Sequence, residues 1–430
     1  PAGCAAWGGK REGAMDESGF AIERRFAKGV PEAAPRFTGF PPYNFIGGHN
    51  DPALIPVDGL IEAAASVLRR EGASLAMYNL AHGPQGYVRL REFVAAKSAA
   101  HRGIACGAED VLITSGSGQG IDLINSLLLA PGDTVLVEEF SYAGAINKLR
   151  KAGVTIVGMP LDEDGIRLDA LEAILGDLRR KGVSPKYIYT IPTIQNPTGS
   201  VLPLDRREAL LRLARAHGVV VFEDECYADL LWAGVEAPPA LYALDPAQVV
   251  HIGSFSKSLA PALRVGYAIA QWPVLSRLVA MKADGGTGAL DQMVVAEYFT
   301  RRFDAHVQEL SAGLAGKLHT MQEALAREFG AAIETWRPRG GIFLWMKLPD
   351  AVDVRTLVKP AADAGIAFNP GPEWACDPDR AASHLRLCFA LPSHEQIRAG
   401  VAAFARVCWE QTGIPAQSGN VRHGGRGERA

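Results

Sequence analysis

The feature that most constrains the fold is a regular alternation of short β-rich runs and amphipathic helical stretches over residues 111–270. Gly and Pro bound the β-rich runs, which are VLITSGS, TVLVEEF, TIVGMP, YIYTIP, VVVFED, VVHIGSF and VGYAIA. Helical patterns such as LDALEAILGDLRRKG and RREALLRLARAHG separate them. This alternation predicts an α/β domain with a mostly parallel, seven-stranded sheet flanked by helices. Ligands of such sheets bind at the carboxyl ends of the strands.

The two ends of the chain lack this pattern. Residues 1–19 and 413–430 are rich in Gly, Ala and charged residues without periodicity, which predicts two disordered tails. Residues 74–305 are predicted to form the large, cofactor-binding domain. Long helical patterns and the runs GGIFLWMKL and SHLRLCFAL predict a smaller α+β domain over residues 306–412. The Pro-rich segment 20–73 is expected to return to this small domain.

Composition and charge exclude several classes of partner. With 48% hydrophobic residues, the 430-residue chain can bury a large core. Lys plus Arg (44) nearly balance Asp plus Glu (47), and there is no dense basic run, which favours small molecules over nucleic acid. Six cysteines without a C-x-x-C pair suit the reducing cytoplasm better than a disulfide framework or a zinc site. No apolar run reaches about 18 residues, so no membrane partner is expected. No metal is expected either, because the cysteines lack a C-x-x-C pair.

Three polar segments follow predicted strands. The turn ITSGSGQG lets backbone N–H groups approach an anion at a helix start, although it also suits an ordinary tight turn and it lacks the G-x-G-x-x-G spacing. Asp224 is the last residue of the run VVVFED. A buried carboxylate at this position needs a hydrogen-bond donor or a cation as its partner, or else it caps a helix. Glu223, Asp224 and Glu225 could instead ligate a metal, but no histidine is near them in the sequence. Asn196, in an Asn-Pro turn, offers a donor and an acceptor.

The segment GSFSKSLAPALRVGY contains the most reactive candidate, Lys257. Ser254, Ser256 and Arg264 flank it and suit an oxyanion or a phosphate. A lysine near cations and away from bulk water has a lowered pKa and is a usable nucleophile, whereas most loop lysines are simply solvated. A serine acyltransferase would also need S-D-N and K-T-G, and a P-loop would need G-x-x-x-x-G-K-[ST]; all are absent. What remains is a lysine amine, an anion site and an acid, which pyridoxal phosphate (PLP) requires.

Several motifs in one order then give a family resemblance. They are NFIGGHNDPALIP, MYNLAHGPQGYVRLREFVA, ITSGSGQG, QNPTG, EDECY, GSFSKSLAPALRVGY, GGIFLW, PGPEW and LRLCFA. In these motifs the chain resembles the fold-type I PLP enzymes, in particular the class I/II aminotransferases of the 2-aminoadipate and kynurenine type. The likeness is collinear over residues 45–390. It implies a PLP-dependent aminotransferase that exchanges an amino group between an L-amino acid and a 2-oxo acid.

The resemblance also implies roles for individual residues. Lys257 is the Schiff-base lysine and catalytic base, and Asp224 keeps the pyridine nitrogen protonated. Arg386 clamps the substrate α-carboxylate, next to Gly48 and Asn196. Tyr142 stacks on the cofactor ring, and Cys226 presses its other face. The remaining cofactor contacts implied are Asn196 and Tyr227 at the phenolic oxygen, and Ser115, Gly116, Ser117, Gly118, Gln119, Ser254, Ser256 and Arg264 at the phosphate. Tyr78 is expected to reach the phosphate of the neighbouring subunit, which implies a homodimer.

Departures from the family concern the substrate side. His49 and Asn50 stand where relatives tend to have apolar residues or proline, and Trp374 replaces a more usual phenylalanine. His49 is expected either to contact the substrate side chain or to cap a loop. The segment KADGGTGALDQ is also unusually rich in glycine.

Two alternatives keep the same scaffold. The first is another PLP reaction on an amino acid, as in a lyase, racemase, decarboxylase or oxidase, because fold does not fix function. The second is the effector domain of a transcription regulator, which would carry a helix-turn-helix domain ahead of it. Fewer than about fifty residues precede the glycine turn, and they show no basic recognition helix, which disfavours the regulator.

Overall fold

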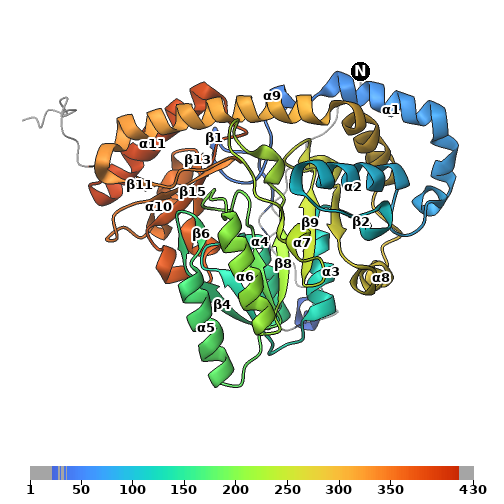
Figure 1. Cartoon of the computed structure of the whole chain (residues 1–430). Coiled ribbons are helices and arrows are strands. Elements are labelled where there is room, and N and C mark those ends of the chain that lie inside the picture. Colours follow the sequence, from blue (N-terminus) through green and yellow to red (C-terminus); the bar gives the residue numbers. More distant parts are fainter. Residues whose placement is uncertain (1–21, 28–29, 31–32, 35, 416–430) are drawn as a thin grey trace, which may run out of the picture. The chain divides into compact units, whose positions relative to one another are not determined.

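Figure 1 shows the computed structural model of the chain, which describes residues 22–27, 30, 33–34 and 36–415. The chain divides into two units, residues 1–39 and residues 40–430. In the first unit, the described part contains a short 3-10 helix, Ile22–Arg25, whose residues are all exposed. The predicted tail 1–19 and all of the predicted tail 413–430 beyond residue 415 lie outside the described residues.

The second unit contains the predicted sheet. Its seven strands are arranged in the order β2-β10-β9-β8-β7-β3-β4. All pairs are parallel except those of β10, which is antiparallel to both of its neighbours. The strands are β2 Val111–Thr114, β3 Thr134–Glu138, β4 Thr155–Met159, β7 Tyr187–Thr190, β8 Val220–Asp224, β9 Val249–Ser254 and β10 Gly266–Ile269. Each falls in one of the β-rich runs, so the predicted mostly parallel α/β fold is confirmed.

Helices cover both faces of this sheet because its buried strands are apolar on both sides. Residues of α3, α4 and α8 pack with Val135, Val137 and Phe222 on one face. Residues of α2, α5, α6, α7 and the start of α9 pack with Leu136, Ile188 and others on the opposite face. The helices are α2 Val88–Arg102, α3 Ser117–Leu128, α4 Ala143–Ala152, α5 Leu168–Arg180, α6 Leu204–Ala216, α7 Leu241–Leu244 and α8 Trp272–Met281.

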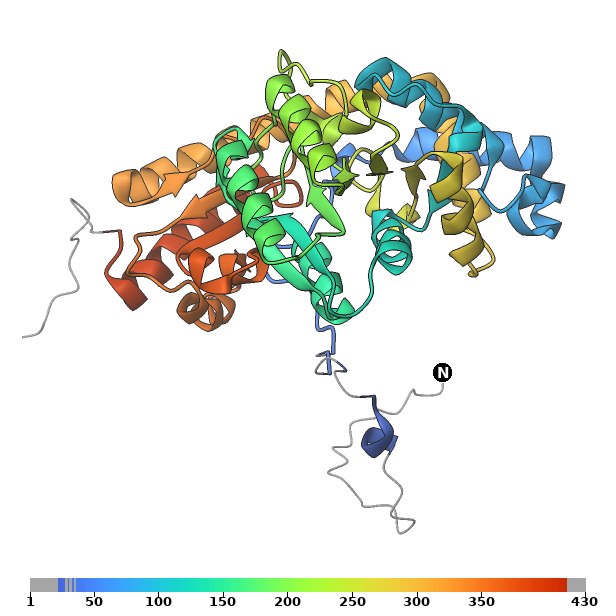
Figure 2. The same cartoon turned by 60° about the horizontal axis from the view of Figure 1, so that its bottom comes forward.

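The C-terminal part forms a second core. A four-stranded antiparallel sheet has the order β11-β12-β15-β14, and α10 and α11 pack on it with the end of α9. In Figures 1 and 2, these elements gather at one end of α9, and α1 and α2 lie toward the other end. The elements are β11 Glu334–Thr335, β12 Phe343–Lys347, β14 Asn369–Pro370, β15 His384–Cys388, α10 Arg355–Asp363 and α11 His394–Thr412.

The N-terminal segment of the second unit contacts both cores. Strand β1, Tyr43–Asn44, pairs in parallel with β13, Ile366–Ala367, beside the C-terminal sheet. Helix α1, Val57–Glu71, contributes Ala63 and Val67 to the core of the large sheet. A small hairpin joins β5, Leu161–Asp162, to β6, Gly165–Ile166.

Helix α9, Ala289–Phe329, is the longest element and crosses the molecule between the two cores. Its residues from Met293 to Phe303 belong to the core of the large sheet, and those from Leu310 to Phe329 belong to the C-terminal core. The predicted domain boundary at residue 305 therefore lies inside one continuous helix, and the domain limits stay a prediction. No helix within the described residues is long and apolar enough to cross a membrane.

Candidate active site

Several of the predicted site residues lie at the carboxyl edge of the large sheet. Asp224 and Ser254 are the last residues of β8 and β9, and Lys257 follows three residues after β9. The turn between β2 and α3 contributes Gly116 and Ser117 to the same edge. Backbone hydrogen-bonding potential at strand ends is free for ligands, which is why binding sites collect there.

An anion cradle surrounds the start of α3. The Arg264 guanidinium donates from Nη2 to the carbonyl of Ser115 (3.2 Å) and from Nη1 to Ser256 Oγ (3.5 Å). Ser254 Oγ lies 3.0 Å from Ser256 Oγ. Gly116 has φ 76°, and a Cβ at this position would overlap the Arg264 guanidinium. Arginine, two hydroxyls and the positive end of a helix together suit a phosphate group.

Lys257 lies in a pocket of carbonyl and thiol groups. Its Nζ donates to the carbonyl of Gly48 (2.6 Å), and a Cβ on Gly48 would overlap that nitrogen. Burial lowers the pKa of Lys257 to about 8, although the nearby thiols of Cys388 and Cys226 raise it, and Arg386 and Arg264 lower it further. An amine with this pKa is partly neutral near physiological pH and can act as a nucleophile or a base.

Asp224 is buried without a cationic partner among the ion pairs of the described residues. Tyr189 Oη donates to its Oδ2 (2.7 Å), and the backbone N–H of Cys226 donates to its Oδ1 (3.2 Å). Burial raises the pKa of Asp224, and the hydrogen bonds from Cys226 and Tyr189 oppose that rise. These neutral donors leave the buried Asp224 carboxylate able to accept a further hydrogen bond from the N–H group of a ligand.

Arg386, on β15, lies beside two aromatic rings. Its guanidinium lies 3.6 Å from the ring centroid of Trp374 and 5.2 Å from that of Phe343. It donates to Asn196 Oδ1 (3.0 Å), to the carbonyl of Gly47 (3.0 Å) and to Asn369 Oδ1 (2.9 Å). Its Nε is buried without a partner. A bound carboxylate would supply the missing acceptor.

Asn196 and Tyr227 complete this side of the site. Asn196 Nδ2 lies 3.5 Å from Tyr227 Oη, and both side chains are buried. Tyr142, at the start of α4, lies 6.2 Å from Trp374 between ring centroids. The neighbourhood of Cys226 includes Asp224, Ser117 and Lys257, and burial raises the pKa of its thiol far above the ordinary value.

Two of the predicted residues lie apart from this constellation. The side chain of Tyr78 is 87% exposed, and in its own chain it lies close to Gly285. Gln119 turns toward the glycine-rich segment, where its Nε2 donates to Asp284 (2.6 Å) while its Oε1 accepts from the N–H of Ser115 (2.9 Å). Gln119 therefore supports the cradle through the backbone of Ser115.

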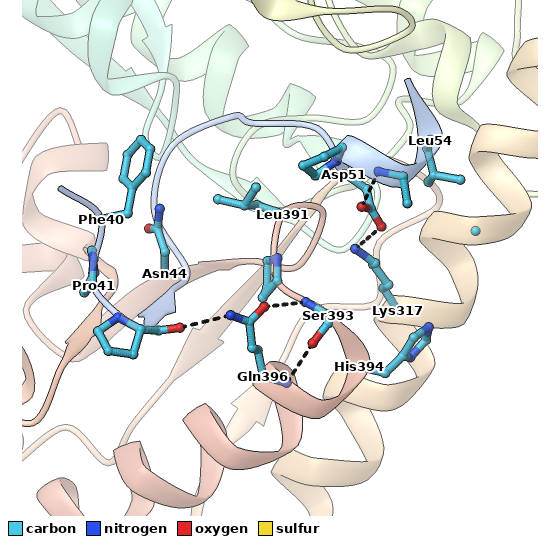
Figure 3. Close-up of a pocket in the computed structure, with 15 residues that line it drawn as sticks. Phe40, Pro41, Asn44, Asp51, Leu54, Lys317, Leu391, Ser393, His394 and Gln396 are labelled. Carbon is cyan, nitrogen blue, oxygen red and sulfur yellow. Dashed lines mark hydrogen bonds and ion pairs between the residues drawn. The ribbon is translucent and has the colours of Figure 1, made fainter. Parts of the chain in front are cut away.

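A hydrogen bond and an ion pair hold the segment that contains His49 and Asn50. Asn50 Nδ2 donates to the carbonyl of Leu259 (2.9 Å), next to the Lys257 loop. Lys317 binds Asp51 (2.5 Å) and the carbonyl of Ala390 (2.6 Å). Figure 3 shows the Lys317–Asp51 ion pair in a separate pocket of about 700 Å³, which Pro42, Leu54, Leu391 and Pro392 also line.

His49 itself faces the ring of Phe40, with centroids 5.1 Å apart. Burial lowers the pKa of His49, and the charge of Lys257 lowers it further. Both effects favour the neutral form of the imidazole.

Sequence reasoning missed several neighbours of the site. Tyr189, on β7, donates to Asp224 on the neighbouring strand β8, a contact that depends on the register between the two strands. Cys388 donates from its thiol to the carbonyl of Gly47 (2.7 Å). His251 lies 2.9 Å from Glu223, so a histidine does stand beside these acids.

The acids flanking Asp224 form a buried group with His251. Glu223, Glu225 and His251 place ligand atoms within 4.8 Å of one another. However, Arg102 binds Glu225 through two nitrogens (2.7 and 2.5 Å), and Arg207 Nη1 lies 3.6 Å from the same carboxylate. The two guanidinium groups already balance these carboxylates, so the group is a structural ion network.

The donor set at the sheet edge fits PLP: an amine, a phosphate cradle, a buried acid and a phenol–amide pair. A sequence model described as "Aminotransferase class I and II" matches residues 48–404. The chain belongs to the class I and II aminotransferases. It is a fold-type I enzyme that transfers amino groups with PLP as its cofactor.

Individual relatives agree with this family. The 2-aminoadipate transaminase of Thermus thermophilus is 37% identical, over 84% of this chain and 89% of the relative. A crystal structure of LysN, an α-aminoadipate aminotransferase from Thermus thermophilus complexed with N-(5'-phosphopyridoxyl)-L-leucine, is 36% identical with a TM-score of 0.78, covering 85% of this chain and 91% of the other. YdfD of Bacillus subtilis, an uncharacterized HTH-type transcriptional regulator, is 31% identical over 74% of this chain and 65% of its own length.

Proposed function

We propose that this aminotransferase acts on L-amino acids and 2-oxo acids, and that Lys257 is its catalytic base. The observation that carries the proposal is the buried Lys257 amine, with its pKa lowered to about 8, bonded to the carbonyl of Gly48 next to the Gly47 carbonyl that binds Arg386. The Nε of Arg386 is without a partner there. A base and a carboxylate clamp close together are what proton removal from the Cα of an amino acid requires.

The cofactor contacts proposed here follow the geometry of the site. Ser254, Ser256, Arg264 and the turn Ser115–Gln119 would hold the phosphate. Asp224 would face the pyridine nitrogen, and Tyr227 with Asn196 would bind the phenolic oxygen. Tyr142 and Cys226 would enclose the ring. When bound, PLP supplies an aldehyde that condenses with amines and a ring that accepts electron density from the substrate Cα.

Arg386 and Lys257 would act on different parts of the substrate, the α-carboxylate and the Cα proton. Arg386, which lies beside Trp374 and Phe343, orients the α-carboxylate without a large ordering cost. Gly48 lacks a Cβ, which leaves room for the Lys257 amine. With the cofactor bound, Lys257 would act as the base that takes the proton from the substrate Cα.

We further propose a cytoplasmic homodimer. Exposed apolar side chains on α1 and the following segment support an interface: Val57, Ile61, Leu68, Leu75, Met77 and Tyr78. In a dimer, Tyr78 would contribute to the phosphate site of the partner subunit. Cys106, Cys226, Cys376, Cys388 and Cys408 are free thiols, which fits a reducing compartment.

A half-reaction test examines the proposed activity. The purified holoenzyme is mixed with single L-amino acids, and the absorbance of the bound cofactor is followed. Conversion to the amine form, followed by recovery on adding a 2-oxo acid, is expected. If no amino acid converts the cofactor, transamination is wrong for this chain, and another PLP reaction replaces it.

The likeness to YdfD favours one second candidate, a ligand-sensing effector domain. A sensor would bind amino acids and change the cofactor spectrum without releasing a 2-oxo acid. Chromatographic detection of the 2-oxo acid over many turnovers separates the two functions. Multiple turnover excludes a purely sensory role.

A further inference from the structure

Tyr189 is the only side-chain oxygen or nitrogen donor bonded to Asp224 in the described part of the chain. Its Oη lies 2.7 Å from Asp224 Oδ2. The backbone N–H of Cys226 binds the other carboxylate oxygen at 3.2 Å, and the Cys226 thiol also bonds to the carboxylate. The shorter bond, O–H to a carboxylate, is of the strong, charge-assisted type.

The position of the Tyr189 hydroxyl is fixed by the sheet. Tyr189 pairs with Phe222 across β7 and β8, and its side chain is 1% exposed. The two rings meet edge to face, with centroids 5.3 Å apart and an interplanar angle of 79°. Since Asp224 follows Phe222 by two residues on the same strand, Asp224 and Tyr189 lie on the same face with little freedom to move.

We propose that Tyr189 is a positioning residue that sets the basicity and orientation of Asp224 toward the pyridine nitrogen of the cofactor. The proposal rests on the proposed role of Asp224. The phenol hydrogen bond stabilises the carboxylate form in a site where burial favours the neutral acid. With the bond in place, Asp224 remains an anion that accepts the ring N–H. Without it, the carboxylate becomes more basic and keeps only its hydrogen bonds to Cys226.

The neighbouring tyrosine supplies a matched control. Tyr187 lies on the same strand, is also 1% exposed and also meets Phe222 edge to face, at 5.7 Å and 83°. Its Oη donates to Asn125 Oδ1 (2.7 Å), away from the site. Tyr187→Phe and Tyr189→Phe therefore each delete one buried hydroxyl with one hydrogen bond, and only the second touches Asp224.

The test compares these two variants with the wild-type holoenzyme. Both variants are expected to lower the melting temperature by similar amounts. Tyr189→Phe is expected to weaken cofactor binding by about 10- to 100-fold, the range for a hydrogen bond to a charged group, and to lower kcat with little change in KM. It should also shift the pH titration of the bound cofactor absorbance. Tyr187→Phe should leave cofactor affinity within about threefold of wild type.

Two further variants make the outcome decisive. In Asp224→Asn, replacing Tyr189 by Phe should add no further loss of cofactor affinity, because the effect passes through the carboxylate. Replacing Tyr189 with 3-fluorotyrosine, a more acidic phenol of nearly the same size, should shift the absorbance titration in the opposite direction from Phe.

Equal cofactor affinities and titrations for Tyr187→Phe and Tyr189→Phe would overturn the inference and leave the proposed function intact. Unchanged cofactor binding in Asp224→Asn would overturn both the inference and the role of Asp224.

Discussion

At the scale of single residues, the active site depends on two carbonyl groups from a glycine turn. The carbonyl of Gly48 binds Lys257, and the carbonyl of Gly47 binds both Arg386 and Cys388. The Lys257 amine is held by a backbone carbonyl, which does not titrate, whereas Arg386 also binds the side chains of Asn196 and Asn369. The pH at which the amine becomes neutral is set first by its burial and then by Cys388, Cys226, Arg386 and Arg264 around it.

The first prediction concerns Lys257→Ala. This variant should lose the visible absorbance of lysine-bound cofactor, and its turnover should fall by at least about 100-fold because the Cα proton has no base. Lys148→Ala, which breaks an exposed pair with Asp122, is the control and should keep both properties. Spectrophotometry and an initial-rate assay check the two. Retention of covalently bound cofactor would remove Lys257 from its assigned role.

The second prediction follows from the lowered pKa of Lys257, about 8 against an ordinary 10.5. Burial disfavours the cation, so the neutral amine forms as pH rises through 8. The rate at which cofactor-free protein recombines with PLP should therefore rise between pH 6 and 8 and level off above about 9. In the unfolded chain Lys257 keeps its proton up to 10.5, so raising the pH from 8 to 10.5 should stabilise the folded cofactor-free protein. A recombination rate that still climbs at pH 10 contradicts the assignment.

The third prediction concerns Arg386. Arg386→Ala should raise KM for amino acids by about 100-fold through loss of a bidentate pair, while binding of simple amines changes little. Arg386→Lys should recover only part of the affinity because an ammonium group cannot form the forked pair. Parallel kinetics with an amino acid and its decarboxylated amine measure the difference. Equal losses for both ligands would argue against a carboxylate clamp.

At the scale of elements, the end of β8 presents its acids to two different environments. Asp224 accepts hydrogen bonds from Tyr189 and Cys226, while Glu223 and Glu225 face Arg102 of α2 and Arg207 of α6. Burial raises the pKa of Glu225, but the charge of Arg102 outweighs it and the pKa lies well below its usual range. This ion network holds the end of β8 through the residues on either side of Asp224, and it therefore restricts the movement of Asp224.

The fourth prediction tests this support. Arg102→Met should destabilise the protein by about 3–5 kcal/mol, because it leaves the Glu225 carboxylate buried with its main partner removed. Lys359→Ala, which breaks an exposed pair with Asp363 on α10, should have little effect. Urea denaturation of both variants gives the comparison. A loss for Arg102→Met no larger than that for Lys359→Ala would show that Arg207 alone neutralises the network.

The elements could be predicted from sequence to different degrees. The strands of the large sheet followed from apolar runs of suitable length between Gly and Pro. The turn after β2 was predicted from its glycines and serines, whereas its phosphate-binding role is a proposal that comes from the family resemblance. The pairing of Tyr189 with Asp224 depends on the register between β7 and β8. Register is set by tertiary packing and is not visible in either run alone. Likewise, Arg102 and Arg207 reach Glu225 from helices that are distant in sequence.

At the scale of the whole molecule, the exposed apolar residues of α1 and Tyr78 support the proposed homodimer. The fifth prediction is that Ile61→Asp, at a side chain that is 61% exposed, converts the dimer to a monomer and lowers cofactor affinity, because Tyr78 no longer reaches the partner subunit. Val358→Asp, at an exposed position of α10, is the control and should remain dimeric. Sedimentation velocity distinguishes the states. A monomeric wild-type protein with full activity would refute the shared site.

Helix α9 has a mechanical consequence for the catalytic cycle. Its 41 residues span about 60 Å, and residues of both cores pack against it. The C-terminal sheet, which includes Arg386, cannot swing about a hinge at residue 305 without breaking several backbone hydrogen bonds there. Movement of that sheet relative to the large sheet would therefore have to bend α9, because residues of both cores pack against this one helix.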